Sequence, residues 1–271
     1  MSKTIRVRLA VPQDVDDLIS LEERVWGGLQ TDVYGAEQFN AWLEVHPEGF
    51  YVAESGGELL GYIYGQRMNF SLPDVDNFTS CAVVTDHGTS RRTHQPDGDS
   101  LYGMSVTSIH PLAGTLLMRA QHRMVKSKKL KSYFGFSRIP GFADYLANLK
   151  TAGFVDEILT EEEEFAVAIW YVYESAGLGN LNFWNVFPSR PDLSLPKPKR
   201  LDPVLGWHLS SWRVPGKTLG VLRLLRKFMP DPQSRDLSVL ICTDLPGLCL
   251  SQTDFGLVRG IGGGTILEDR Q

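Results

Sequence analysis

The chain has 271 residues and a formal net charge of −5, with 27 Lys and Arg against 32 Asp and Glu. Proteins that bind nucleic acids broadly gather Lys and Arg against the phosphates, so this balance argues against a general nucleic-acid role. Hydrophobic residues make up 42% of the chain, which is enough for a sizeable core. The length suits either two domains or one α+β domain with long insertions.

The cysteines and the apolar stretches indicate the cellular compartment in which the protein functions. Cys81, Cys242 and Cys249 are scattered without the spacing of metal ligands. An odd number of cysteines without a secretion signal predicts reduced thiols in the cytoplasm. No stretch approaches the ~18 apolar residues of a membrane helix. We therefore expect a cytoplasmic protein with no metal, no membrane span and no nucleic-acid partner.

The N-terminal part predicts a strand, two helices and a hairpin. Apolar residues alternate over Thr4–Leu9, as in a half-buried strand. A helix opens at Pro12 and runs to Trp26, and a second one covers Ala36–Glu44. Two strands, FYVAE and LLGYIYGQRM, flank a Ser-Gly-Gly turn and predict an antiparallel hairpin over residues 50–68.

The middle of the chain predicts a strand that feeds a helix. A polar segment, Asn69–Ser100, has the composition of a mobile loop or lid. The buried strand Leu101–Ile109 follows, Pro111 stops it, Gly114 lies in the turn, and a helix begins at Thr115. Free N–H groups at such a helix start bind anions such as phosphate. The same unit is also common without any ligand.

The C-terminal half is less regular. Ser132–Ser137 predicts a strand and Phe142–Leu149 a helix. Phe165–Tyr173 is apolar throughout, so periodicity leaves strand and buried helix open. Leu219–Phe228 predicts an amphipathic basic helix, and Leu237–Thr243 predicts a strand.

This order of elements resembles the GNAT superfamily of acyl-CoA-dependent N-acyltransferases. The residues that carry the resemblance are IRVRLAVPQDVDDLISLE (5–22), FYVAESGGELLGYIYGQRM (50–68) and MSVTSIHPLAGTLLM (104–118). The resemblance implies an α+β (α/β) fold with a mixed, mostly antiparallel sheet, flanking helices and splayed central strands. It implies an acyl-thioester-binding core over residues 1–150, an insertion over 151–200, a C-terminal part of the fold over 201–247 and a flexible tail over 248–271.

The same resemblance implies a binding site for the pantetheine thioester. By resemblance, the strand holds the pantetheine arm and the following turn receives the phosphates, which assigns Ser105, Val106, Thr107, Ser108, Ile109, Gly114, Thr115 and Leu116. The phosphate loop departs from the family form Q/R-x-x-G-x-G/A, because residues 110–114 contain one glycine. Each missing donor removes ~1.5–3 kcal/mol of phosphate binding. A carrier-protein phosphopantetheine, with one phosphate, would lose less than CoA.

A second resemblance concerns the reaction centre. SRIPGFADYL (137–146), DPVLGWHL (202–209), HQPDG (94–98) and Trp26 are similar to GNAT-like loading domains of modular polyketide synthases. This second resemblance implies that the reaction centre contains Ser137, His208 and Trp26. A histidine can take a proton from an amine near neutral pH, and a serine hydroxyl can stabilise an oxyanion. A structural histidine and a capping serine would explain the same residues.

Three functions fit these observations. The first is acyl transfer from acyl-CoA (acetyl-CoA or longer) or an acyl-carrier-protein phosphopantetheine to a small-molecule or peptide amine. The second is decarboxylation of a malonyl thioester with transfer to a carrier-protein thiol, for which Lys126–Lys131 or Arg223–Lys227 offers a basic docking face. The third is a degenerate GNAT scaffold that binds without chemistry. We expect the first.

Overall fold

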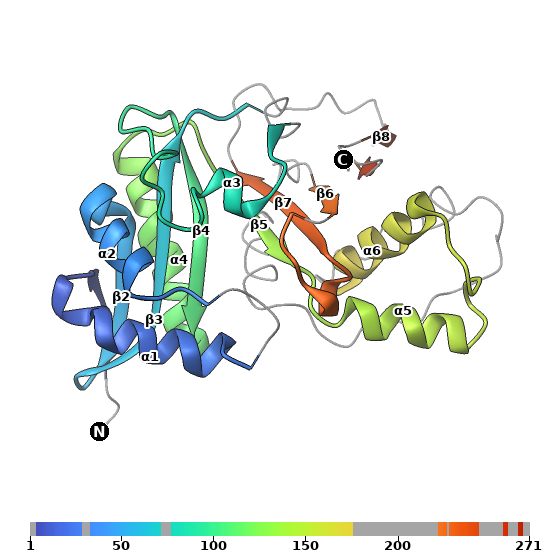
Figure 1. Ribbon diagram of the computed structural model, residues 1–271, viewed down its shortest axis with the longest axis horizontal. Helices are drawn as coiled ribbons and strands as arrows, with labels where there is room; N and C mark the ends of the chain where they lie inside the picture. Colours follow the sequence, from blue (N-terminus) through green and yellow to red (C-terminus); the bar gives the residue numbers. More distant parts are fainter. Residues whose placement is uncertain are drawn as a thin grey trace. The chain divides into compact units, whose positions relative to one another are not determined.

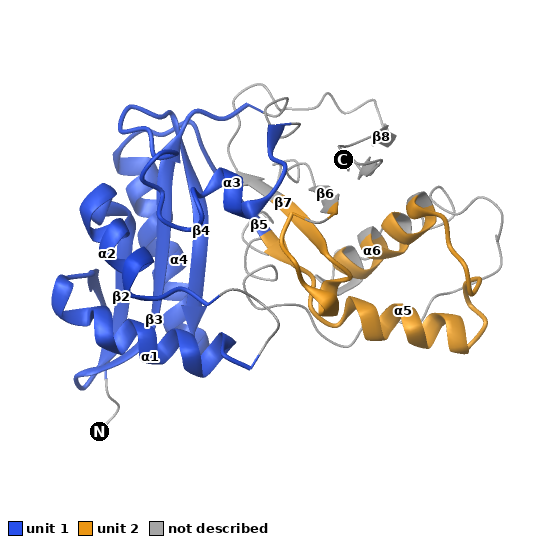
Figure 2. Cartoon of the chain, viewed as in Figure 1, with its two compact units in different colours: residues 1–136, 242–246 blue, residues 137–241, 247–271 orange. Residues whose placement is uncertain are grey.

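The computed structural model describes residues 4–28, 33–71, 77–175, 222–226, 228–243, 257–259 and 265–267. The chain divides into two compact units, residues 1–136 with 242–246 and residues 137–241 with 247–271 (Figure 2). The first break falls after Phe136, within a strand. The division into four segments, at residues 150, 200 and 247, stays a prediction.

Unit 1 is built on a mixed sheet (Figure 1). Its strands lie in the order β1 (Arg6–Leu9), β2 (Phe50–Ser55), β3 (Glu58–Met68), β4 (Ser100–Ser108) and β5 (Ser132–Arg138), the last of which continues into unit 2. The pairs β1–β2, β2–β3 and β3–β4 are antiparallel, and the pair β4–β5 is parallel. The predicted mixed, mostly antiparallel sheet with flanking helices is confirmed.

Helices cover both faces of this sheet (Figure 1). α1 (Val15–Trp26) and α2 (Ala36–Val45) pack on one face, and α4 (Pro111–Ser127) packs on the other. A short 3-10 turn, Pro12–Asp14, precedes α1. There the Asp14 carboxylate accepts two hydrogen bonds from the Arg8 guanidinium, at 2.7 and 2.8 Å. This bidentate pair fixes the entry of α1 against β1.

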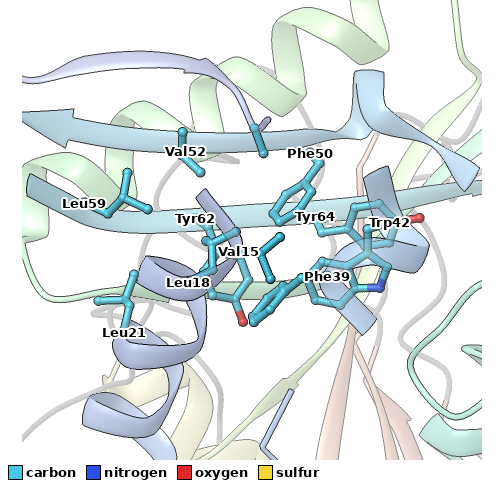
Figure 3. Close-up of a cluster of buried hydrophobic side chains, with 11 residues drawn as sticks. Val15, Leu18, Leu21, Phe39, Trp42, Phe50, Val52, Leu59, Tyr62 and Tyr64 are labelled. Carbon is cyan, nitrogen blue, oxygen red and sulfur yellow. The ribbon is translucent and has the colours of Figure 1, made fainter. Parts of the chain in front are cut away.

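Aromatic side chains dominate the core between α1, α2 and the sheet (Figure 3). Trp42 is fully buried, stacks on Tyr64 with ring centroids 4.4 Å apart, and meets Phe39 edge to face. Its indole N–H donates to the Gly88 carbonyl at 2.6 Å. Edge-to-face and stacked rings bury a large apolar area, and here the indole N–H of Trp42 keeps a hydrogen-bond partner.

The segment predicted as a mobile loop has more internal structure than its composition indicated. Its described part contains the helix α3 (Cys81–Val84). The Arg67 guanidinium donates to Gly98 O at 2.8 Å, which fastens the end of the segment to β3. Phe70 and Phe78 stack on Phe134 of β5, with centroids 3.8 and 6.2 Å apart. Aromatic packing scattered through a polar sequence gave no periodic signal.

Unit 2 corrects one prediction and resolves one alternative. Its elements are α5 (Phe142–Thr151), α6 (Glu161–Ser175), β6 (Leu222–Arg226), η5 (Pro232–Ser234), β7 (Leu237–Thr243), β8 (Leu257–Arg259) and β9 (Thr265–Leu267). The apolar stretch 165–173 is therefore helical. The amphipathic helix predicted over 219–228 is wrong: the described residues 222–226 form β6, which pairs with β7 on one side and β9 on the other. Strand pairing on both edges overrides local helical spacing.

Replacing Trp42 by Phe tests the aromatic core. The smaller ring leaves a void beside Tyr64 and removes the donor to Gly88 O, so the free energy of unfolding should fall by ~2–4 kcal/mol. Urea unfolding measures this loss. Val83→Ala, at a position 58% exposed, is the control and should stay within ~0.5 kcal/mol of wild type. Equal losses in both variants would contradict the assignment of Trp42 to the core.

Candidate functional site

Strand β4 changes its pairing on both edges at one residue. On the β3 side, Tyr64 lies opposite Ser105 while Gly65 lies opposite Gly103, so Met104 is an extra residue, a β-bulge. On the other side, the parallel register with β5 runs from Ser100↔Ser132 to Gly103↔Gly135 and ends there. In the described structure, β4 pairs with both β3 and β5 up to Gly103. Beyond it, the strand continues to pair with β3 alone, through Ser108.

Two glycines permit the close approach at the last β4–β5 pair. A Cβ on Gly135 would lie 2.9 Å from Gly103 O, and a Cβ on Gly103 would overlap the ring of Tyr133. The pair of glycines thus brings the two strands together immediately before they separate. This placement fits the diverging strands that the GNAT resemblance implied.

The bulge also turns two hydroxyl side chains toward α1. Side chains alternate along a strand, and one inserted residue reverses which face each later residue occupies. Ser105 and Thr107 consequently share the face covered by α1. Thr107 Oγ1 donates to Glu22 Oε2 at 2.9 Å, and Ser105 Oγ lies 3.1 Å from Tyr62 Oη.

Glu22 is the centre of this polar cluster. Its side chain lies on α1 and is 2% exposed. Tyr62 Oη donates to Glu22 Oε2 at 2.5 Å, beside the bond from Thr107. Burial raises the pKa of Glu22, and the two hydroxyl donors oppose that shift. The result is a buried carboxyl whose described hydrogen-bond donors are all neutral.

Trp26 joins the same cluster. Its indole N–H donates to Thr107 Oγ1 at 2.7 Å, so the structure brings together a predicted reaction-centre residue and a predicted pantetheine residue. Glu22 and Tyr62 were missed by sequence reasoning. A signal existed for Glu22: it stands four residues after Leu18 and four before Trp26, so an acidic residue interrupts the inward-facing stripe of α1.

The start of α4 corrects the predicted turn. The helix begins at Pro111, so Gly114 and Thr115 lie inside it rather than in a loop before it. Pro111 has no N–H, Leu112 N donates to His110 Nδ1 at 3.2 Å, and Gly114 N donates to His110 O at 3.1 Å. Most of the expected phosphate donors are therefore absent or already paired.

The remaining predicted residues have varied placements. Val106 and Ser108 lie on β4, Ile109 N donates to Leu60 O at 2.9 Å, and Leu116 lies on α4. Ser137 belongs to unit 2, where it is 8% exposed and its hydroxyl donates to Arg138 O at 3.2 Å. His208 lies outside the described residues.

The described ranges contain neither a cluster of metal ligands nor a membrane-spanning helix. There, no three His, Cys, Asp or Glu side chains gather as ligands for a metal ion. None of the helices found in those ranges has the length and hydropathy to cross a bilayer.

The sheet, its flanking helices and the separation of β4 from β5 define the fold of GNAT domains, and this chain has the GNAT fold. It is similar to the structure of the GphF GNAT-like decarboxylase in complex with isobutyryl-CoA, with a TM-score of 0.55, 20% identity, and coverage of 89% of this chain and 100% of that chain. It is also similar to the loading GNATL domain of CurA from Lyngbya majuscula, with a TM-score of 0.59, 17% identity, and coverage of 89% and 98%.

Comparisons of sequence alone reach less far. No protein-family model matches the chain. The "Probable hydrolase YhcX" of Bacillus subtilis (strain 168) is 28% identical over 163 residues, a match that covers 58% of this chain and 30% of YhcX. The chain thus spans under a third of that relative's length.

Replacing Gly114 by Ala tests the corrected helix start. An added Cβ would find its nearest neighbour, Ser108 Cβ, at 3.6 Å, which is ordinary contact. Alanine favours a helix over glycine, so unfolding should require about 0.5 kcal/mol more free energy. Urea denaturation checks this gain. A loss of stability would place Gly114 outside the helix.

Replacing Glu22 by Gln tests the buried carboxyl. Because the folded-state pKa of Glu22 is raised, the folded chain binds more protons than the unfolded chain above the ordinary value of 4.5. This contribution to stability is present at acid pH and is lost as pH rises through the folded pKa. The stability of wild type relative to E22Q should thus decline as pH rises from 4.5 toward the raised folded-state pKa of Glu22. A parallel pair of stability curves would contradict the shift.

Proposed function

We propose that this protein transfers an acyl group from a pantetheine thioester to an amine acceptor. The observation that carries the proposal is the end of the β4–β5 register at Gly103 and Gly135. Beyond that pair, the backbone of residues 104–108 offers hydrogen-bonding groups along one strand edge, which suits the amides of an extended pantetheine arm. Ser105 to Ile109 would line that arm.

The donor is proposed to be acyl-CoA or a carrier-protein phosphopantetheine. The described N–H groups at the start of α4 are mostly paired, which supports an acyl donor that depends little on phosphate contacts. Gly114, Thr115 and Leu116 would lie beside its single phosphate. His208 is proposed as the base that deprotonates the amine, and Ser137 as a donor to the oxyanion. Trp26, whose indole N–H donates a hydrogen bond to Thr107, would line the binding site at the thioester end of the arm.

A second function is favoured by one comparison. The GphF structure that matches over its whole length is described as a GNAT-like decarboxylase. Decarboxylation of a malonyl-type thioester, with transfer to a carrier-protein thiol, would use the same strand edge for the pantetheine arm. It would need no amine base, so His208 would then serve to polarise the thioester carbonyl.

Incubation with acetyl-CoA, malonyl-CoA, longer acyl-CoAs and acyl-carrier proteins, followed by mass spectrometry, tests both functions. Thiol release that requires an added amine, with an acylated amine as product, is the expected result. Loss of the malonyl carboxylate without an amine would establish the second function instead. No reaction with any donor would contradict both and leave a binding scaffold.

His208→Ala tests the proposed base. If His208 takes the proton of the amine, turnover should fall by ~10²-fold or more while thermal unfolding stays near wild type. The same measurement on His87→Ala is the control, because His87 belongs to the segment between β3 and β4 and has no role in the proposal. An unchanged rate in His208→Ala would remove it from the mechanism.

A further inference from the structure

We propose that Glu22, Tyr62 and Ser105 form a proton relay that ends at the β4 bulge and delivers a proton to the leaving thiolate. The inference rests on the proposed acyl transfer, since it names the source of that proton. Glu22 and Tyr62 act through Ser105 and are positioning residues in this scheme. The three oxygens are linked by successive contacts of 2.5 and 3.1 Å.

The indole of Trp26 fixes the direction of one branch of the network. An indole N–H can only donate, so Thr107 Oγ1 must accept the bond from Trp26. The single hydroxyl proton of Thr107 is then committed to Glu22 Oε2. This branch keeps the same donors and acceptors whether Glu22 is ionised or protonated.

The Tyr62 branch can reverse. When Glu22 is ionised, Tyr62 donates to it, and the Tyr62 oxygen is free to accept a proton from Ser105. When Glu22 is protonated, its O–H donates to Tyr62, Tyr62 donates to Ser105, and the Ser105 proton points out of the network. Proton uptake by the buried carboxyl therefore makes a donor available at Ser105. Ser105 is half-buried, whereas Glu22 and Tyr62 are closed off.

The groups packed around Glu22 suit a carboxyl that holds a proton. It faces Tyr62 from β3, Thr107 from β4 and the backbone N–H of Tyr34, which lies 3.5 Å from Oε1. None of these partners is a cation, so among the described residues nothing that bonds to Glu22 compensates a full negative charge. Burial raises the pKa of both Glu22 and Tyr62, which disfavours a tyrosinate and favours concerted movement along the chain.

The proton balance of the step is complete. The amine nitrogen forms a bond to the thioester carbonyl carbon, the C–S bond breaks, and its electron pair stays on sulfur. Ser105 gives its proton to that sulfur, takes one from Tyr62, and Tyr62 takes one from Glu22, which ends ionised. The proton released by the amine goes to its base, and before the next turnover water returns a proton to Glu22 through Ser105 and Tyr62.

The first test needs no turnover. Infrared spectra of the full chain above pH 4.5, the ordinary value for this carboxyl, should show a protonated-carboxyl band that is absent from Glu22→Gln. Tyr62→Phe should shift that band, because it removes the partner of the acid proton. Tyr64→Phe is the matched control: it also removes a buried hydroxyl from β3, but outside the network, so the band should not move.

The second test uses the pH dependence of turnover. In wild type, kcat should fall as pH rises through the folded-state pKa of Glu22, and Glu22→Gln, Tyr62→Phe and Ser105→Ala should each lower kcat by ~10²-fold with that limb abolished. Tyr64→Phe should retain the wild-type profile. A wild-type limb in Tyr62→Phe would overturn the relay. If no donor reacts, the acyl transfer fails, while the infrared result alone still decides whether the relay exists; wild type and Glu22→Gln with the same spectrum would refute it.

Discussion

The candidate site depends on one constraint, the approach of β4 and β5 at Gly103 and Gly135 followed by the bulge at Met104. A side chain at either glycine would collide with the opposite strand, so the sheet closes there only because both Cβ atoms are absent. One residue later β4 has an unmatched position against β3 and no further register with β5. A regular strand would keep Ser105 and Thr107 on the α4 face. The bulge instead places them against Glu22 and Tyr62, so the polar cluster forms next to the point where, among the described residues, the register of β4 with β5 ends.

Burying a carboxyl group in a protein core costs free energy. The Glu22 carboxyl is 2% exposed, has neutral hydroxyl donors, and accepts one of its hydrogen bonds from Tyr62, a member of the apolar cluster drawn in Figure 3. Replacing such a group by an apolar one often stabilises a protein. The four hydrogen bonds that join Glu22, Tyr62, Thr107, Trp26 and Ser105 satisfy its polar atoms, but they do not remove the cost of burying charge. An arrangement that keeps the carboxyl neutral avoids that cost, which is why a raised pKa and a stable fold are compatible here.

The sequence predicted unit 1 well because its elements are regular and locally encoded. The strand and helix over Thr4–Trp26, the hairpin over 50–68 and the strand after residue 100 each appear within a few residues of the predicted bounds. The helix expected over 219–228 failed because Leu222–Arg226 is held by β7 and β9, and pairing with distant strands leaves no local mark. The start of α4 was placed four residues late because glycine and proline were interpreted as a turn, although proline is favoured in the first turn of a helix. Within the site, Thr107 and Trp26 were predicted, whereas Glu22 and Tyr62 were missed. Their contacts with Thr107 and Ser105 depend on the bulge at Met104, which the spacing of residues does not reveal.

The two ends of β4 offer a ligand different hydrogen-bonding groups. At the α4 end, His110 occupies the Leu112 N–H and Pro111 lacks one, so the helix start has little left to offer a diphosphate. At the bulge end, strand backbone, Ser105 and the Glu22 cluster offer neutral hydrogen-bonding groups and a store for one proton. Affinity would therefore come from the length of the pantetheine arm along the strand rather than from nucleotide charge. A donor anchored by its own carrier domain gains effective concentration that free CoA lacks, which offsets weak phosphate contacts without any added residue. In the proposed transfer, a tethered acyl donor would therefore bind better than a diffusing one.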